Sequence, residues 1–365
     1  MNKFYILPSV IVVILLEAFI VSPKKEFSEN ENRNLEPFPE VSAESLLSGD
    51  LAENLGTYIE DHFPFRDSFM ELNGVFSVYV LGQKEVNGIY IGKDGSFLEK
   101  YNKPETMDDT VDKLNNLAEK TNSKVYCALV PTAAEIYSEK LPNFAEVPTQ
   151  YEEMEEYYSR IKADNIDVYS PLYENKEEKL YYNLDHHWTT KAAYIAYREI
   201  AAEMGFEPFD ESYFDIEQVT DDFKGTIYSK VNMGADKADT IELYKTDTDY
   251  TVTYTDTEEV SDSFYNLDYL DMKDKYSLFL NNLHPLTEIK NNSKEARGSL
   301  AVIKDSFANC LVPFLAKHYK TIYVFDTRYY RGSVCDFINE NNIENTLILY
   351  NLNTIDTDLG IDAIY

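Results

Sequence analysis

Cysteine is scarce in this chain. Its 365 residues include only three cysteines, Cys127, Cys310 and Cys335, and none stands close to another in the sequence. An odd number of scattered thiols argues against a disulfide framework, and the lack of a close pair argues against a cysteine-ligated zinc cluster. We therefore expect neither kind of scaffold.

Basic residues are also few, with 33 Lys and Arg against 65 Asp and Glu and a formal net charge of -32. A surface of that sign repels a phosphate backbone, so we expect no nucleic-acid binding. Hydrophobic residues make up 44% of the chain and aromatic residues 14%, which excludes a disordered polymer. The length is sufficient for one large domain, or two, with a sizeable core.

One long apolar run lies at the amino end. It extends from Phe4 to Val21 with Glu17 near its end, and a polar Ser-Pro-Lys-Lys segment follows it. The run is about as long as a helix that crosses a bilayer and longer than the apolar core of a signal peptide, and Ala18-Phe19-Ile20 is a poor cleavage site. We expect residues 1–25 to be a membrane anchor or an uncleaved signal, with the following chain outside the cell membrane. A buried core helix is the less favoured alternative.

The next segment is polar and has no hydrophobic periodicity. Residues 28–40 (SENENRNLEPFPE) combine charge, asparagine and two prolines, so we expect a stalk linker over 26–44. One folded domain is then predicted over 45–365. Near its start, the peptide EDHFPFRD places Pro64 between two expected helices.

Short apolar segments alternate with helical patterns through most of this domain. Such alternation predicts an α/β fold with a doubly wound, mostly parallel sheet, whose active sites gather at the carboxyl ends of the strands. A small hairpin is expected over 87–98. Strands are expected over 124–130, 166–169, 300–303, 322–325 and 347–350, and helices over 107–117, 151–161 and 307–318.

An acidic segment, residues 205–275, separates two blocks of this alternation. It contains the alternating stretch Tyr250 to Tyr254 (YTVTY), and we interpret the whole segment as an insertion. Its charge is most simply a solvated face. Cation binding is the alternative, although no calcium-loop spacing is present.

Two of the five histidines stand beside an acid and the only tryptophan, in the tetrapeptide Asp185-His186-His187-Trp188, just before a helix that Thr189 or Thr190 would cap. In an extended segment, Asp185 and His187 project to the same side. A carboxylate on Nδ1 would fix the imidazole tautomer and leave Nε2 free as the general base of a hydrolase triad. An ordinary hydrogen-bonded histidine pair fits equally well. Zinc fits less well, because neither a His-x-x-x-His pair nor a cysteine partner is present.

A candidate nucleophile, Ser306, follows the expected strand 300–303 and precedes a helical pattern. A hydroxyl at such a turn points into the crevice of the sheet, and the helix amino terminus offers N–H groups to an oxyanion. A simple helix N-cap is the alternative. Together with His187 and Asp185, Ser306 supplies all three roles of a triad. Weaker candidates for substrate or oxyanion contact are His186, Phe307, Asn309, Arg328 and Tyr329.

These motifs, in this order, resemble the bacterial DHHW proteins, named for the tetrapeptide at 185–188, and more distantly the SGNH hydrolase-like domain of alginate O-acetyltransferases. The resemblance covers nearly the whole chain, from the apolar run through IGKDGSFLE, LVPTAAEIYSEKLP and IKDSFAN to DTRYY. It implies an extracytoplasmic, three-layer α/β/α domain with Ser306 as nucleophile and Asp185 with His187 as its Asp-x-His pair. Lys304 departs from the Gly-Asp-Ser signature of SGNH hydrolases.

The resemblance also implies a function. We expect a membrane-anchored serine O-acyltransferase or esterase that acts on a cell-envelope or secreted polysaccharide and needs no cofactor or metal. Its implied partner is a membrane-bound O-acyltransferase that delivers acyl groups. The alternative is a non-catalytic envelope protein of the same fold that binds a glycan or a partner protein.

Overall fold

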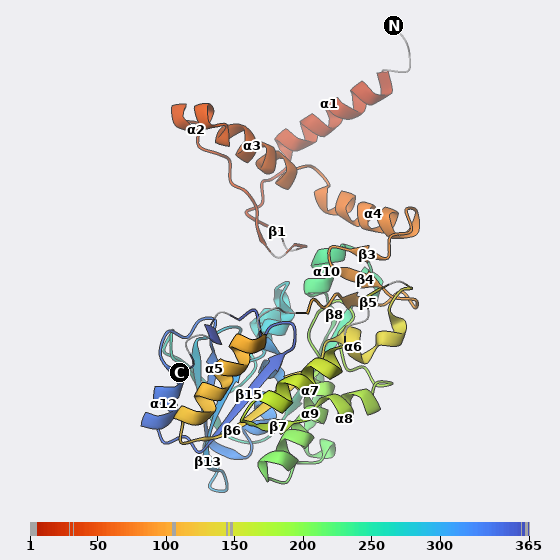
Figure 1. Cartoon of the computed structure of the whole chain (residues 1–365). Helices are drawn as coiled ribbons and strands as arrows, with labels where there is room; N and C mark the ends of the chain where they lie inside the picture. Colours follow the sequence, from red (N-terminus) through yellow and green to blue (C-terminus); the bar gives the residue numbers. More distant parts are fainter. Residues whose placement is uncertain are drawn as a thin grey trace.

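The computed structural model describes residues 6–28, 30–31, 33–103, 107–143, 145–146, 149–358, 360–361 and 364. The described chain forms a layered body and an amino-terminal arm that projects from it (Figure 1). The body holds the large sheet and the arm holds the first four helices.

The body is built on an eight-stranded sheet with the order β11-β10-β12-β14-β13-β15-β6-β7. The strands β14, β13, β15, β6 and β7 pair in parallel, and β12, β10 and β11 extend the sheet in antiparallel pairing. The bounds are β6 Lys124–Val130, β7 Asp164–Ile166, β10 Tyr250–Tyr254, β11 Glu259–Ser261, β12 Leu286–Asn291, β13 Arg297–Lys304, β14 Tyr319–Asp326 and β15 Asn345–Asn351. The predicted α/β class and mostly parallel sheet are therefore confirmed.

Helices cover both faces of this sheet because successive side chains of a strand point to opposite faces. In β6, Val125, Cys127 and Leu129 belong to one core cluster, and Tyr126, Ala128 and Val130 belong to another. The first cluster includes side chains of α5 Met107–Lys120, α7 Gln150–Arg160 and α12 Val334–Glu340, and the second those of α9 Thr190–Met204 and α11 Val312–Leu315. The body thus has three layers.

The acidic segment is only partly separate from this body, contrary to the predicted insertion. Strand β10 lies in the main sheet between β11 and β12, with Tyr250, Val252 and Tyr254 buried. The alternation of YTVTY reflects that one buried face. The same segment also contains the two-stranded sheet β8 Asp215–Phe223 and β9 Asp239–Lys245, and the helix α10 Thr226–Val231.

Three other predicted elements differ in their bounds. The strand expected over 166–169 is β7 at 164–166, and the helix α8 Tyr169–Glu174 begins where the strand was expected to end. The helix expected over 307–318 is a short 3-10 helix, η7 Ser306–Cys310, followed by α11 with a proline in its first turn. The expected hairpin is present as β3 Glu85–Val86, β4 Ile89–Ile91 and β5 Phe97–Glu99, near the short α6 Ala133–Ile136.

The arm contains α1 Ile6–Val21, α2 Ala43–Ser48, α3 Asp50–Asp61 and α4 Arg66–Tyr79. Pro64 separates α3 from α4 as predicted. The expected linker carries a small hairpin, β1 Phe27–Ser28 with β2 Arg33–Asn34. Although the domain was expected to begin at residue 45, α2 buries no residue and α3 buries only Asp61, so these helices belong to the arm.

The predicted membrane anchor falls partly outside the described residues, which begin at Ile6. Within the part of the chain that the structure describes, no helix has both the length and the apolar composition of a bilayer span. Helix α1 itself has 16 residues.

Candidate active site

A short turn presents the DHHW tetrapeptide to the edge of the sheet. Tyr181 pairs with Trp188 in an antiparallel bridge, and the Tyr182 N–H donates to the carbonyl of His187. The buried carboxylate of Asp239 accepts from the N–H groups of Asn183 (2.9 Å) and Leu184 (2.7 Å). The backbone just before the tetrapeptide is therefore fixed by a strand, β9, that lies more than fifty positions away in the sequence.

The structure joins the three predicted triad residues in one hydrogen-bond chain. Nδ1 of His187 lies 2.5 Å from Oδ1 of Asp185, and Nε2 of His187 lies 2.7 Å from Oγ of Ser306. Asp185 is 2% exposed and His187 6% exposed, whereas Ser306 is partly exposed. The hydroxyl is thus the accessible end of the chain and the carboxylate is its buried end.

Asp185 is held as a carboxylate by several donors. Its Oδ1 accepts from the backbone N–H of His187, and its Oδ2 accepts from the N–H (2.9 Å) and the hydroxyl (3.2 Å) of Thr226. Burial alone would raise the pKa of Asp185, but the positive charges that His187 and His186 carry when protonated, together with these hydrogen bonds, lower it far below the usual range of a carboxyl. An ionised Asp185 accepts a hydrogen bond from the Nδ1–H group of His187, which leaves Nε2 as an acceptor.

The His187 ring is neutral and fixed in orientation. Burial lowers the pKa of His187, and the charge of His186 lowers it further, while Asp185 and Asp274 act in the opposite direction. The Tyr276 ring stacks on the imidazole at 3.7 Å between centroids and an interplanar angle of 7°. The Tyr276 hydroxyl donates to the carbonyl of Ser306 at 3.1 Å, so one side chain contacts both the base and the loop of the nucleophile.

Ser306 begins η7 directly after the carboxyl end of β13. Asp305 is the N-cap: its Oδ1 accepts from the Phe307 N–H, and its Oδ2 accepts from the Asn351 N–H at 2.7 Å. The Phe307 N–H, an expected oxyanion donor, is therefore engaged by the cap. Asp305 rather than Ser306 caps this helix, so the N-cap alternative for Ser306 is wrong.

The aromatic side chains of the two motifs join the two halves of the site. The Trp188 indole N–H donates to the Phe307 carbonyl at 2.8 Å, and both side chains are buried. Phe307 is thus a packing residue beneath His187. Asn309 is 2% exposed, and its Oδ1 has no hydrogen-bond partner among the described residues.

The remaining weaker candidates lie apart from the triad. Arg328 binds Asp326 through Nε (2.8 Å) and Nη2 (2.6 Å), and Lys304 binds the same carboxylate at 3.0 Å. Lys304 therefore points to the neighbouring strand end. Arg328 also lines a separate cavity of about 620 Å³ with Asp305 and Tyr330, while Tyr329 is 45% exposed.

His186 contacts the triad from the side. Its Nδ1 lies 2.7 Å from the Thr226 hydroxyl, and its ring lies 3.9 Å from the His187 ring. Asp185, His186 and His187 are close enough for a shared metal ion. Most of the atoms of these three side chains that could bind a metal already make hydrogen bonds, either to Thr226 and Ser306 or between Asp185 and His187. The geometry therefore favours a proton relay over a set of metal ligands.

Sequence reasoning missed Tyr276, Thr226 and the adjacent Gly225. A Cβ on Gly225 would lie 2.0 Å from Oδ2 of Asp185, so only glycine allows the α10 backbone to approach this carboxylate. No local signal distinguishes Tyr276 among 30 tyrosines or Gly225 among 13 glycines. Both residues lie in or just after the segment that we interpreted as an insertion.

Comparisons with known proteins agree with this architecture. The family model of the DHHW proteins matches residues 82–325. A DHHW family protein from Eubacterium siraeum is 26% identical, with a TM-score of 0.68 over 76% of this chain and 96% of that one. PatB1 from Bacillus cereus, solved with a sulfonyl adduct, is 20% identical, with a TM-score of 0.62 over 76% of this chain and 98% of that one.

A lower similarity extends to the O-acetyltransferase domain of Pseudomonas putida AlgJ, with a TM-score of 0.45, 11% identity, and coverage of 74% of this chain and 92% of that one. No curated protein sequence matches the chain. The family model spans well over half of the 365 residues and includes the whole Asp-His-His-Trp segment. The chain belongs to the DHHW protein family.

Proposed function

We propose that this protein is a serine-dependent O-acyltransferase or esterase. The observation that carries the proposal is the continuous hydrogen-bond chain from Asp185 through His187 to Ser306, which begins at a buried carboxylate and ends at an accessible hydroxyl. Such an arrangement activates a serine for attack on an acyl carbon.

Each member of the chain has a separate role in the proposed mechanism. His187 Nε2 takes the proton of Ser306 as Oγ attacks the acyl carbonyl, and Asp185 stabilises the imidazolium that forms. The tetrahedral intermediate then breaks its bond to the leaving alcohol, which receives that proton from His187. In the second half, His187 deprotonates an acceptor hydroxyl or water, which attacks the acyl-serine and releases Ser306.

Two groups near Ser306 are candidates for the oxyanion hole. The Ser306 N–H donates no hydrogen bond to the described residues, unlike the Phe307 N–H. Asn309 lies three positions after Ser306, where residues of a 3-10 helix superimpose, and its side-chain NH2 group is a hydrogen-bond donor. We propose that the backbone N–H of Ser306 is one oxyanion donor and that the side-chain NH2 group of Asn309 is the other.

The PatB1 structure supports a nucleophilic mechanism for a protein of this fold. PatB1 was solved with a sulfonyl adduct, and sulfonyl electrophiles react with activated nucleophilic side chains. By analogy with this relative, we propose that the same class of reagent modifies Ser306. The proposed substrate is a cell-envelope or secreted polysaccharide, and the proposed acyl donor partner is a membrane-bound O-acyltransferase.

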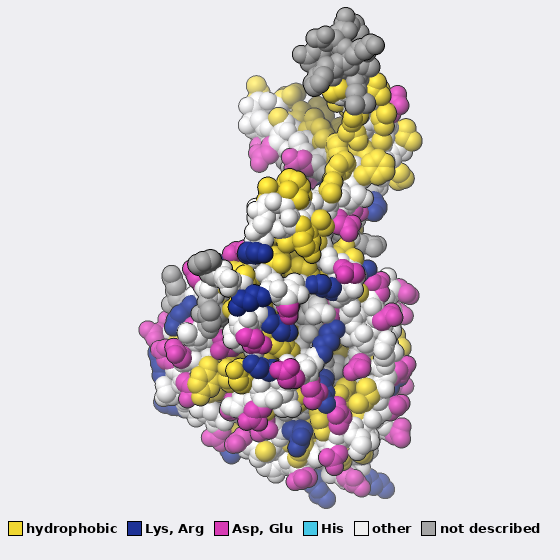
Figure 2. All heavy atoms as spheres, turned by 90° about the vertical axis from the view of Figure 1, so that its right-hand side faces the viewer, with side chains coloured by type: hydrophobic (Ala, Val, Ile, Leu, Met, Phe, Trp, Pro, Cys, Tyr) yellow, Lys and Arg dark blue, Asp and Glu magenta, His cyan; other side chains and the backbone are white. Residues whose placement is uncertain are grey.

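We further propose that the arm faces a membrane. The apolar run predicted as an anchor includes α1, whose side chains from Val10 to Val21 are largely exposed. Figure 2 shows hydrophobic side chains gathered along the arm, in contrast to the mixed charges of the body. Helix α4 and its flanks add a stripe of exposed apolar side chains, namely Phe65, Phe69, Leu72, Phe76 and Val80.

The membrane proposal is tested by fractionation of cells that express the chain. We expect the full chain to stay in the membrane pellet after an alkaline carbonate wash, and a chain without residues 1–25 to leave it. Full release of the unaltered chain by carbonate would contradict an integral anchor.

The catalytic proposal is tested by turnover of p-nitrophenyl acetate with the full chain in detergent micelles. We expect Ser306→Ala and His187→Ala each to lower kcat/KM by at least roughly 10³-fold, the scale seen when a member of a triad is removed. Ser170→Ala, at an exposed serine of α8, is the matched control and should leave kcat/KM unchanged. Equal turnover by Ser306→Ala and the unaltered chain would favour the non-catalytic binding alternative.

A further inference from the structure

Tyr276 contacts both the base and the nucleophile loop of the proposed triad. It lies in a short 3-10 helix, η6 Lys275–Leu278, and is 3% exposed. Its ring stacks on the imidazole of His187, and its hydroxyl donates to the carbonyl of Ser306 at 3.1 Å. The ring and the hydroxyl therefore contact different members of the triad.

The stack between Tyr276 and His187 has almost no lateral offset. The ring centroids are 3.7 Å apart, and the ring planes are inclined by 7°. Because carbon atoms of stacked rings pack at about 3.5–4.0 Å, this centroid distance leaves little room for the rings to be displaced sideways. The electron-rich faces of two neutral rings repel each other in that arrangement, so neutral aromatic pairs prefer an offset or an edge-to-face contact. The stack therefore suits a neutral imidazole poorly.

The same geometry suits an imidazolium. When Oγ of Ser306 bonds to the acyl carbon, the proton of the hydroxyl passes to Nε2 of His187 and the ring gains a positive charge. A cation over the face of a tyrosine ring is attracted to it, and more strongly where both groups are desolvated. His187 and Tyr276 are both buried, so water screens this attraction little. The contact is thus stronger in the transition state than in the ground state, which is the condition for a contribution to catalysis.

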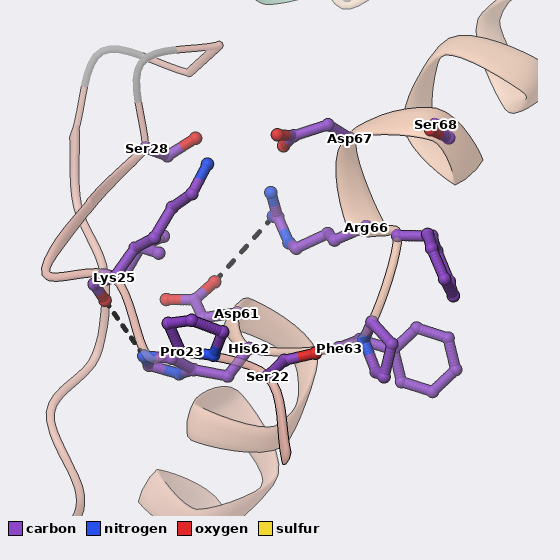
Figure 3. Close-up of a pocket in the computed structure, with 13 residues that line it drawn as sticks. Ser22, Pro23, Lys25, Ser28, Asp61, His62, Phe63, Arg66, Asp67 and Ser68 are labelled. Atoms are coloured by element: carbon purple, nitrogen blue, oxygen red, sulfur yellow. Dashed lines mark hydrogen bonds and ion pairs between the residues drawn. The ribbon is translucent and has the colours of Figure 1, made fainter. Parts of the chain in front are cut away.

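Other histidines of the chain also contact tyrosines, but with a different geometry. The ring of His62 lies 4.2 Å from that of Tyr58 at an angle of 32°, and the ring of His284 lies 4.2 Å from that of Tyr254 at 27°. Both ring nitrogens of His62 face backbone carbonyls, one of which is drawn in Figure 3 at the base of the arm. Among the histidines that the structure describes, only His187 combines a nearly parallel stack on tyrosine with a nitrogen that faces a serine hydroxyl.

Two aromatic side chains hold the Tyr276 ring against the imidazole. Tyr182 makes an edge contact with it at 6.3 Å between centroids, and Phe279 makes a tilted contact at 5.1 Å. Both side chains are buried. The packing of the protein therefore sets the position of the ring before an imidazolium forms, as preorganised stabilisation requires.

The hydroxyl of Tyr276 acts on the loop that carries the nucleophile. Burial raises the pKa of Tyr276 well above its ordinary value, so the hydroxyl keeps its proton and remains a donor. It donates to the carbonyl of Ser306, and Sγ of Cys310 lies 3.3 Å from the same oxygen. Ser306 and Cys310 are the first and last residues of η7. One hydroxyl thus contacts both ends of the helix that begins at the nucleophile.

We propose that Tyr276 is a positioning residue of the triad, whose ring stabilises the imidazolium of His187 and whose hydroxyl holds the loop of Ser306. This inference rests on the proposed function, because the imidazolium forms when His187 takes the proton of Ser306.

The role of the ring is tested by the pH dependence of p-nitrophenyl acetate turnover with the full chain in detergent micelles. The titratable groups that face His187 are Asp185, His186, Asp274 and Tyr276, and the side chains of η7 in contact with it are uncharged. Tyr276→Leu removes the ring face from the protonated imidazole and changes none of the charged groups. We expect kcat/KM to fall roughly tenfold or more and its acid limb to move to lower pH.

A change in the electron density of the ring at constant shape tests the same role whether or not Tyr276→Leu folds. Trifluorophenylalanine at this position keeps the ring shape of Tyr276→Phe but withdraws electron density from the ring face, which weakens its attraction for a cation. We expect Tyr276→Phe to keep the acid limb of the unaltered chain. The fluorinated variant should move the limb to lower pH.

Tyr276→Phe also tests the hydroxyl. Loss of the hydrogen bond to the Ser306 carbonyl should lower kcat by about two- to tenfold, the scale of one hydrogen bond. Tyr58→Leu, at the tyrosine that contacts His62 in the arm, is the matched control and should leave both kcat and the acid limb unchanged. Thermal unfolding reports whether each variant is folded.

The two proposals fail in different ways. Absence of Ser306-dependent p-nitrophenol release from the unaltered chain would overturn the proposed function. Ser306-dependent release would leave that function in place, and the role of the ring would then be excluded by an acid limb that stays or moves to higher pH in Tyr276→Leu. An acid limb at the same pH in Tyr276→Phe and the fluorinated variant would exclude it equally. An unchanged kcat in Tyr276→Phe would contradict the role of the hydroxyl.

Discussion

The residue on which the site geometry depends most is Asp185. It receives hydrogen bonds from the next turn of its own segment and from α10, so its position is set from two sides. Gly225 allows the second approach, since any Cβ there would overlap the carboxylate. Because Asp185 is hydrogen-bonded to Nδ1 of His187, a displacement of the carboxylate would also displace the His187 ring.

We therefore predict that Gly225→Ala inactivates the protein. Displacement of the carboxylate by about 1 Å would misplace the base and lower kcat/KM by roughly 10²-fold. The measurement is p-nitrophenyl acetate turnover. Gly56→Ala is the matched control, because its added Cβ meets no atom within 4 Å and α3 should gain helix propensity. Equal activity of the two variants would contradict this role of Gly225.

The pH dependence of turnover should report His187. Because burial and His186 lower the pKa of His187, the loss of activity on its protonation is expected at a lower pH than for an ordinary histidine. We predict that His186→Gln, which removes a charge that lowers the pKa of His187, moves the acid limb of kcat/KM to higher pH. A limb that stays in place or moves to lower pH in this variant would contradict the assignment.

Sequence reasoning expected Asp185, His187 and Ser306 to lie together because each has a local signal, and the structure joins them by hydrogen bonds. Asp185 and His187 stand two apart in an extended segment, and Ser306 stands at a strand-to-helix turn. The contacts of Tyr276 and Thr226 have no such signal, since they depend on how two distant segments fold back onto the tetrapeptide. Of the weaker oxyanion candidates, Asn309 stays a prediction, whereas the N–H of Phe307 donates to the Asp305 cap, a contact that the sequence does not indicate.

At the scale of elements, β9 supports the tetrapeptide through Asp239. This side chain is fully buried and binds two backbone N–H groups as well as Lys179 at 2.7 Å. Burial raises the pKa of Asp239 despite these donors, which indicates that the environment is strongly desolvated.

Asp239→Ala should therefore lower the stability of the folded protein. Loss of the carboxylate leaves the part-buried N–H of Asn183 and the buried N–H of Leu184 without this acceptor, and we predict a decrease of about 2–4 kcal/mol in the free energy of unfolding. Urea denaturation measures it. Glu217→Ala, at an exposed ion pair of the adjacent β8, should change stability by less than about 1 kcal/mol. A cost below 1 kcal/mol for Asp239→Ala would contradict the supporting role of β9.

The parallel strands β6, β13, β14 and β15 were predictable because most of their residues are buried and because they contain continuous apolar runs. The antiparallel strand β10 has one buried face, so its sequence predicts a strand without indicating which sheet it joins. The end of β7 and the start of α8 differ from the prediction by a few residues because an apolar run of that length fits either structure. The short 3-10 helix after Ser306 follows from the Asp305 cap and from Pro313 in the next turn.

At the scale of the whole molecule, the excess of acidic residues determines how the solubility of the protein depends on pH. The chain has an isoelectric point of about 4.4. We predict minimum solubility near that pH, where net repulsion between molecules vanishes, and rising solubility toward neutral pH. Turbidity across a pH series measures it. A minimum near neutral pH would contradict the charge balance of the exposed surface.

The central claim is that Ser306 is a nucleophile activated by His187. The most direct test is to treat the full chain in detergent micelles with phenylmethylsulfonyl fluoride or a fluorophosphonate and to locate the adduct by peptide mass spectrometry. We predict one dominant adduct on the peptide that contains Ser306, and its loss in both Ser306→Ala and His187→Ala. An unmodified Ser306 in the unaltered chain, or an adduct that persists in His187→Ala at the original rate, would contradict the claim.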